Sequence, residues 1–145
     1  MYNTVVHRSF VNVMAKGANQ GLDARMGGGY AEGAYAHRLL VRSGGRVAFV
    51  RVQEIDWIEA QGNYLRLHRG TGSYLVRQTM NDMEAFLDPH KFIRIHRSTI
   101  VSIDRIKEIR PMPRGDYEVT LLDGVRLTLS RKYRDKAPLS LRNLL

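Results

Sequence analysis

The side chains that could do nucleophilic or acid–base chemistry are scattered through the sequence. His96 and Ser98 lie close together with Asp104 downstream, but no nucleophile elbow or oxyanion site accompanies them. The five histidines show neither HExxH spacing nor an acidic pair at ligand spacing. Cysteine is absent, which excludes disulfides, thiolate zinc sites and cysteine nucleophiles. The sequence therefore predicts no catalytic activity, no metal site and no cofactor.

Basic side chains are the chemistry that the sequence supplies in quantity. The 145 residues hold 23 Lys and Arg against 14 Asp and Glu, a formal charge of +9. The segment Lys91–Arg114 alone carries seven basic residues against two acidic ones, and arginine greatly outnumbers lysine throughout. Arginine suits bidentate contacts with phosphate and guanine. This charge predicts a polyanionic partner, with nucleic acid first and an acidic membrane surface second.

Three polar or basic breaks, each at the end of an expected strand, could meet such a partner. They are Gln61-Gly62-Asn63-Tyr64, His96-Arg97-Ser98 and Ser130-Arg131-Lys132. In the last two, a serine before an expected helical turn could bind a phosphate oxygen, while the neighbouring arginine reaches a guanine edge. The alternative is that Ser98 and Ser130 only cap turns while the arginines lie in solvent. The pattern alone favours neither interpretation.

Short apolar or alternating segments from His37 onward predict a mainly β domain that positions these breaks. The expected strands cover residues 37–42, 47–52, 55–60, 64–68, 74–77, 92–95, 100–103, 106–110, 117–121 and 125–129. Thr79 is expected to cap one helix that buries Met80 and Met83 and ends near Asp88. Ser130 is expected to cap a second, short helix over Arg131–Lys136.

The last expected hairpin can be given a register from its apolar faces. A two-residue loop, Asp123-Gly124, would place Thr120 opposite Leu127 and mix the faces. A three-residue loop that begins at Leu122 pairs Val119 with Leu127 instead. Matching faces therefore predict the longer loop, with Gly124 in the left-handed conformation.

Residues 1–36 differ from the rest of the chain. They hold six of the 13 glycines and show no sustained helical or alternating pattern. The run Gly27-Gly28-Gly29 lacks the strand, helix and lysine of a phosphate-binding loop. We expect 1–36 to be a flexible, glycine-containing segment and 37–145 to be the domain. No apolar run approaches the roughly 20 residues of a membrane helix, so we expect a cytoplasmic protein without a membrane segment.

Several of these segments together resemble the LytTR-type DNA-binding domain. They are Ile55–Tyr64, Phe92–Val101, Asp123-Gly124 and Ser130–Tyr133, and their order and spacing agree with the successive motifs of that family. The resemblance implies an elongated arrangement of short strands in small sheets with one or two short helices. It also implies a bacterial transcription regulator whose inter-strand loops enter successive major grooves of double-stranded DNA, with two copies on repeated sites.

The resemblance places the DNA contacts on the same three breaks. It implies base reading at Asn63 and Tyr64, a second set at His96, Arg97 and Ser98 with Arg97 at the base, and a third set at Ser130, Arg131 and Lys132 with Arg131 on guanine. We expect the three breaks to gather on one edge. Ser102 stands where the family often has Asn. Thirty-six residues cannot form the receiver domain typical of the family, so any upstream sensor system is not encoded here.

Two other kinds of partner remain open at this stage. The alternative to DNA is an acidic protein or membrane surface that meets a basic, β-rich interaction module. RNA is a weaker alternative, because single-strand readers display exposed aromatic side chains on a sheet face. Here Tyr64, Tyr74 and Tyr117 alternate in phase with aliphatic residues or stand at strand ends.

Overall fold

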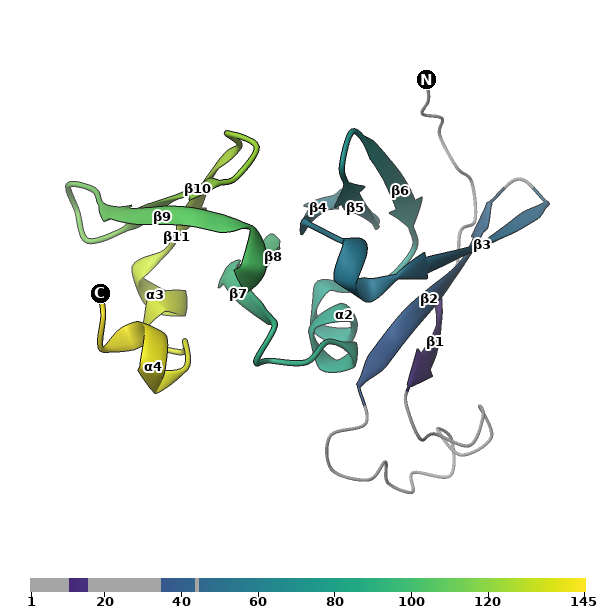
Figure 1. Cartoon of the computed structure of the whole chain (residues 1–145), viewed down its shortest axis with the longest axis horizontal. Coiled ribbons are helices and arrows are strands. Elements are labelled where there is room, and N and C mark those ends of the chain that lie inside the picture. The colour runs from purple at the N-terminus through teal and green to yellow at the C-terminus, as the bar shows by residue number, and fades with distance from the viewer. Residues whose placement is uncertain (1–10, 16–34, 44) are drawn as a thin grey trace. The chain divides into compact units, whose positions relative to one another are not determined.

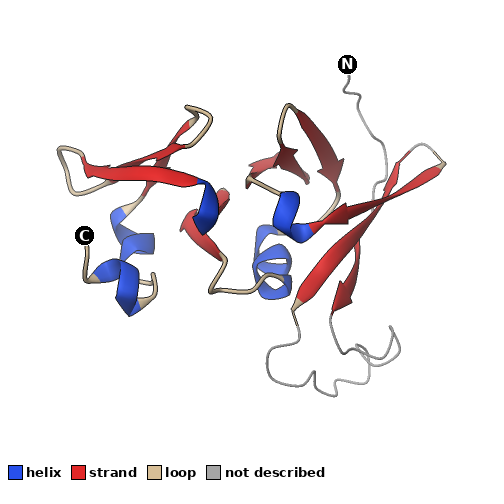
Figure 2. Ribbon diagram, in the orientation of Figure 1, coloured by secondary structure: helices blue, strands red, loops and turns tan. Residues whose placement is uncertain are grey.

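Short strands in small antiparallel sheets make up most of the computed structural model, with a few short helices (Figures 1 and 2). The structure describes residues 11–15, 35–43 and 45–145. It divides into unit 1, Met1–Asp88, and unit 2, Pro89–Leu145. None of the helices among the described residues has the length and apolar character to cross a membrane. The mainly β fold with short helices that the sequence predicted is confirmed.

The first sheet of unit 1 has three antiparallel strands. In order they are β1 (Val11–Ala15), β2 (Ala36–Ser43) and β3 (Arg46–Arg51). Leu39 and Val41 of β2 and Val50 of β3 are buried, so one face of this hairpin packs into the core. The strands expected at residues 37–42 and 47–52 are confirmed, and they pair with each other.

Strand β1 differs from the expectation for residues 1–36. Val11 pairs with Val41 and Val13 with Leu39, so this part of the segment joins the sheet as a third strand. Its five residues have no flanking turn signal, so their pattern was too short to predict a strand. Its partner β2 also lies more than 20 residues away in sequence. The Gly27-Gly28-Gly29 linker lies outside the described residues.

The second part of unit 1 is an antiparallel meander followed by a helix. Its elements are the 3-10 turn η1 (Val52–Glu54), β4 (Trp57–Gln61), β5 (Tyr64–Arg69), β6 (Gly72–Val76) and α2 (Met80–Phe86). The Trp57 ring stacks on the His68 ring of the neighbouring strand, with centroids 4.0 Å apart. The Thr79 hydroxyl accepts the Asp82 N–H at 3.0 Å, which confirms the predicted cap. Met80 and Met83 are buried, also as predicted.

Unit 2 contains one hairpin, one three-stranded sheet and two helices of a single turn each. Its elements are β7 (Phe92–His96), β8 (Thr99–Ser102), the 3-10 turn η2 (Ile103–Arg105), β9 (Ile106–Pro111), β10 (Tyr117–Leu121), β11 (Arg126–Leu129), α3 (Arg131–Arg134) and α4 (Leu139–Arg142). The sheet runs in the order β11-β10-β9, and alternate residues of β10 are buried. Helix α3 is shorter than the predicted span Arg131–Lys136, and Asp135 is its C-cap residue.

The predicted register of the last hairpin is confirmed. Val119 pairs with Leu127, and the Leu121 N–H donates to the Val125 carbonyl at 2.8 Å. Gly124 closes the three-residue loop with φ +95° and donates its N–H to the Leu121 carbonyl at 2.9 Å. An L-residue reaches this conformation only at a cost of about 1–2 kcal/mol.

Replacing Gly124 with alanine is therefore expected to lower the free energy of unfolding by about 1–2 kcal/mol, through backbone strain alone. No atom lies within 4 Å of the added Cβ, so a clash does not contribute. Urea denaturation of both proteins measures the change. Gly72→Ala is the matched control, since its backbone has an ordinary φ and its Cβ would meet only the Arg69 carbonyl at 3.8 Å. Equal losses for the two variants would rule out strain at Gly124.

Candidate nucleic-acid interface

The turn between β7 and β8 carries His96, Arg97 and Ser98. Arg97 is exposed, whereas His96 and Ser98 are half-buried. The Ser98 N–H donates to His96 Nδ1 at 3.2 Å, and the Ser98 hydroxyl lies 2.9 Å from the same nitrogen. Because Nδ1 accepts the Ser98 N–H, the neutral ring carries its proton on Nε2. The turn therefore presents a guanidinium and an imidazole N–H.

Ser98 corrects one expectation from the sequence. It lies in a β-hairpin turn and does not precede a helical turn, so no row of free amides stands behind it. The reason is local, since β8 resumes at Thr99 and pairs that residue with His96. The Ser98 hydroxyl is already bonded to His96, which makes it a weaker phosphate ligand than predicted.

The connection from β11 to α3 carries Ser130, Arg131 and Lys132. The Ser130 hydroxyl accepts the Tyr133 N–H at 3.3 Å, so the predicted cap is confirmed. Arg131 and Lys132 are exposed on the first turn of α3. The Ser130 N–H donates to the Ile95 carbonyl at 2.9 Å. This bond brings the third predicted contact set beside the second, although more than 30 residues separate them in sequence.

Arg94 joins the same two connections through its side chain. Its Nη2 donates to the Arg97 carbonyl at 2.6 Å and its Nε to the His96 carbonyl at 3.3 Å. Its guanidinium carbon also lies 5.4 Å from the centre of the Tyr133 ring on α3. Arg94 holds the backbone of one loop while packing on the helix that follows the other. The contact residues expected from the sequence did not include Arg94.

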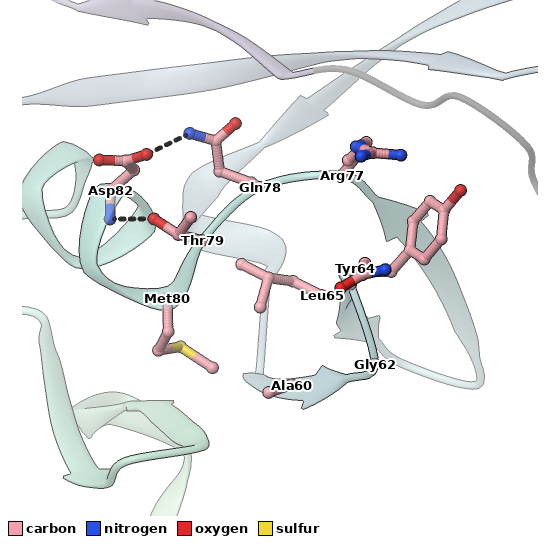
Figure 3. Close-up of a pocket in the computed structure, with 10 residues that line it drawn as sticks. Ala60, Gly62, Tyr64, Leu65, Arg77, Gln78, Thr79, Met80 and Asp82 are labelled. Atoms are coloured by element: carbon pink, nitrogen blue, oxygen red, sulfur yellow. Dashed lines mark hydrogen bonds between the residues drawn. The ribbon is translucent and has the colours of Figure 1, made fainter.

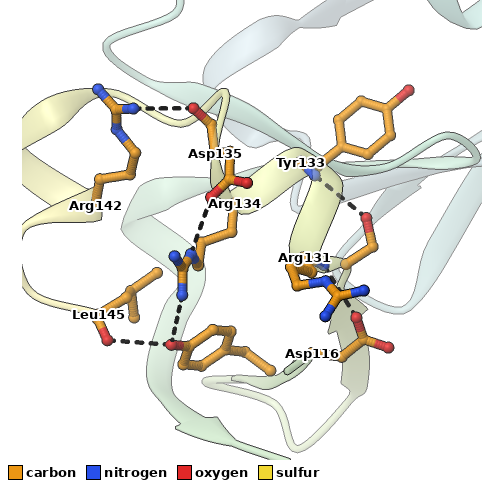
Figure 4. Close-up of polar contacts among 9 residues, drawn as sticks. Asp116, Arg131, Tyr133, Arg134, Asp135, Arg142 and Leu145 are labelled. Carbon is orange, nitrogen blue, oxygen red and sulfur yellow. Dashed lines mark hydrogen bonds and ion pairs between the residues drawn. The ribbon is translucent and has the colours of Figure 1, made fainter. Parts of the chain in front are cut away.

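Helix α3 is also fixed from its other side (Figure 4). Arg134 Nη1 donates to the Tyr117 hydroxyl at 3.2 Å, and that hydroxyl donates to the Leu145 carbonyl at 3.1 Å. The bond to Tyr117 is the main cause that raises the pKa of Arg134 above its ordinary value. Arg142 donates to the Asp135 carbonyl at 3.1 Å. Arg134 thus serves the internal structure of unit 2, whereas Arg131 and Lys132 remain exposed.

The first predicted contact set lies in unit 1, at the β4–β5 turn. Gly62 turns the chain with φ +62°, Asn63 is exposed and Tyr64 is half-buried at the start of β5. An open pocket of about 540 Å³ adjoins this turn and is lined by both residues (Figure 3). Arg77, after β6, lines the same pocket and is exposed. The turn therefore offers an amide and a phenol, with a cation nearby.

The distribution of charge favours unit 2 as the more basic surface. Its sequence has 13 Lys and Arg against six Asp and Glu, which is +7 of the total +9. In this unit, Arg110 forms an ion pair with Glu118, and Arg134 forms one with Asp135. Within the described part of the chain, Arg97, Arg131 and Lys132 have no ion pair. The same part shows no group of three or more His, Asp or Glu residues arranged to hold a metal.

Comparison with known proteins identifies the fold and its family. The family model described as the LytTr DNA-binding domain matches residues 45–140. The structure superimposes on the LytTr DNA-binding domain of a Bacillus cereus protein described as a methyl-accepting/DNA response regulator, with a TM-score of 0.63 and 21% identity. That match covers 69% of this chain and 92% of the other. The fold that the resemblance implied is therefore confirmed.

Curated relatives are bacterial regulators of greater length. The sensory transduction protein LytT of Bacillus subtilis is 30% identical over 67% of this chain and 40% of its own length. The transcriptional regulatory protein LytR of Staphylococcus aureus is 30% identical over 61% of this chain and 36% of its own length. The chain spans about two fifths of the length of these relatives. With two thirds of its residues matched by the family model, the chain belongs to the LytTr DNA-binding domain family.

Proposed function

We propose that the chain binds double-stranded DNA at specific sequences, as the DNA-reading module of a cytoplasmic transcription regulator without catalytic activity. The main support is one observation in unit 2. The Ser130–Ile95 bond and the Arg94 side chain join the two predicted loops there, and the loops expose Arg97, Arg131 and Lys132 together. Membership of a DNA-binding domain family supports the choice of DNA among the polyanions.

The exposed groups divide into those that read bases and those that provide affinity. Arg97 and Arg131 are proposed to reach base edges, because a guanidinium can donate two parallel bonds to O6 and N7 of guanine. Lys132 is a point charge and is proposed to contact a phosphate. His96 can donate through Nε2, and the Ser130 hydroxyl keeps its proton for a phosphate oxygen, since it accepts from Tyr133.

Asn63 and Tyr64 are proposed to read an adjacent major groove of the same duplex. The resemblance to the LytTR-type domain supports this assignment. Two copies are proposed to bind repeated sites. An upstream sensor system is the proposed source of regulation, in line with the sensory transduction name of the Bacillus subtilis relative.

Selection of bound duplexes from a random DNA pool tests the proposal, followed by mobility shifts on the selected duplex and on a scrambled duplex of equal composition. We expect the selected duplex to bind more tightly at physiological salt. If about six phosphates are neutralised, log affinity should fall with log salt at a slope near −5. Equal affinity for the two duplexes would instead indicate a basic module for an acidic protein or membrane surface.

Arg131 and Lys132 are neighbours with predicted roles that differ. Arg131→Ala should cost about 1–3 kcal/mol on the selected duplex and relax selectivity at one base pair. Lys132→Ala should weaken binding to both duplexes by a similar factor. Titration of each variant against both duplexes separates the two roles. A uniform loss for Arg131→Ala would reassign Arg131 to a phosphate.

A further inference from the structure

The loop between β9 and β10, residues 112–116, lies against the third predicted contact set. The Asp116 carboxylate accepts the Arg131 N–H at 3.0 Å. A Cβ added at Gly115 would stand 3.2 Å from Arg131 Cδ and 3.5 Å from Nη1, so the arginine side chain lies directly over this glycine. The loop is thus a neighbour of the residue that is proposed to read guanine (Figure 4).

The backbone of this loop is unusual at Arg114, an exposed residue. Arg114 has φ +82°, and among the described residues no other non-glycine has a positive φ. Gly115 follows with φ +90°, and the Met112 N–H closes the loop on the Asp116 carbonyl at 2.9 Å. A strained conformation of a non-glycine residue persists only when the surroundings enforce it, and such residues cluster at binding sites. Here it sets an exposed cation at the tip of a closed loop.

The acidic groups near this tip are already engaged. Asp116 accepts the Arg131 N–H, and Glu118 pairs with Arg110 at 2.7 Å. In the described part of the chain, Arg114 has no ion pair, and neither does Arg131. Arg114 and Arg131 are therefore exposed cations at adjoining points of the surface, where the nearby carboxylates of Asp116 and Glu118 already have partners. Such a surface fits an external anion with closely spaced charges, which the phosphates of a duplex provide.

We propose that Arg114 contacts the DNA phosphate backbone beside the base pair that Arg131 reads, which makes the β9–β10 loop a fourth DNA-contacting element. This inference rests on the proposed function. A phosphate is favoured over a base because the Arg131 side chain, which is proposed to read the base, already lies over Gly115, the residue next to Arg114. Phosphates line both walls of a DNA groove and are the usual partners of arginines at its edge.

The test compares Arg114→Gln and Arg114→Gly with the wild-type chain on the selected and scrambled duplexes over a range of salt. Both variants remove the charge, and glycine also relieves the positive φ, so a loss shared by both cannot result from a destabilised loop. Arg126→Gln is the matched control. It removes an exposed arginine from the end of β11 that pairs with Thr120, far along the strand from Ser130.

Both Arg114 variants should lose affinity by a similar factor on the two duplexes, with the salt slope reduced by about 0.9 and selectivity unchanged. Arg126→Gln should bind like the wild-type chain. Wild-type affinity and slope in the Arg114 variants, while Arg131→Ala still loses selectivity, would overturn the inference and leave the proposed function intact. Altered selectivity at one base pair would overturn the phosphate assignment. A wild-type chain that does not distinguish the duplexes would overturn the proposed function itself.

Discussion

The hydrogen bonds from Arg94 to the carbonyls of His96 and Arg97 are the interaction on which the proposed reading surface depends. A hairpin turn leaves carbonyl groups without partners in the ladder, and only a side chain or water can satisfy them. Here a guanidinium does so, and its central carbon also lies over the Tyr133 ring of α3, 5.4 Å from the ring centre. Charge-assisted bonds of this kind are stronger than neutral ones. Arg94, which is half-buried, therefore fixes the turn that displays Arg97 and ties it to the helix that displays Arg131.

The rest of unit 2 holds this arrangement in place. The Ser130–Ile95 bond anchors the start of α3 to the end of β7, and the Tyr117 hydroxyl links Arg134 to Leu145. A helix of four residues has little stability of its own, so tertiary contacts must supply it. These contacts use some cations and leave others exposed. Arginines that bond internal acceptors, such as Arg134, stabilise the fold, whereas arginines without such acceptors, such as Arg131, stay exposed.

Local rules predicted those parts of the fold that depend on neighbours in sequence. The caps at Thr79 and Ser130 and the register of the last hairpin follow from residue types within a few positions, and all three are confirmed. Strand β1 depends on a partner distant in sequence, and no local pattern marked it. The candidate contacts could be named from loops and motifs, but Ser98 shows that a serine before a turn does not fix the kind of turn. The joining role of Arg94 needed coordinates, because an arginine on the polar face of a strand usually lies in solvent.

The most direct test of a joint reading surface is the selectivity of Arg94→Met, measured with each base pair of the selected duplex replaced in turn. Loss of the forked bonds should reduce discrimination at two separate base pairs together, those assigned to Arg97 and to Arg131. Arg94→Lys should restore it only in part, because an ammonium cannot make the same forked pair of bonds as a guanidinium. Arg126→Met, which removes the same charge elsewhere on unit 2, should leave discrimination unchanged. Full discrimination at both base pairs in Arg94→Met, or a loss spread evenly over every duplex, would contradict the joint surface.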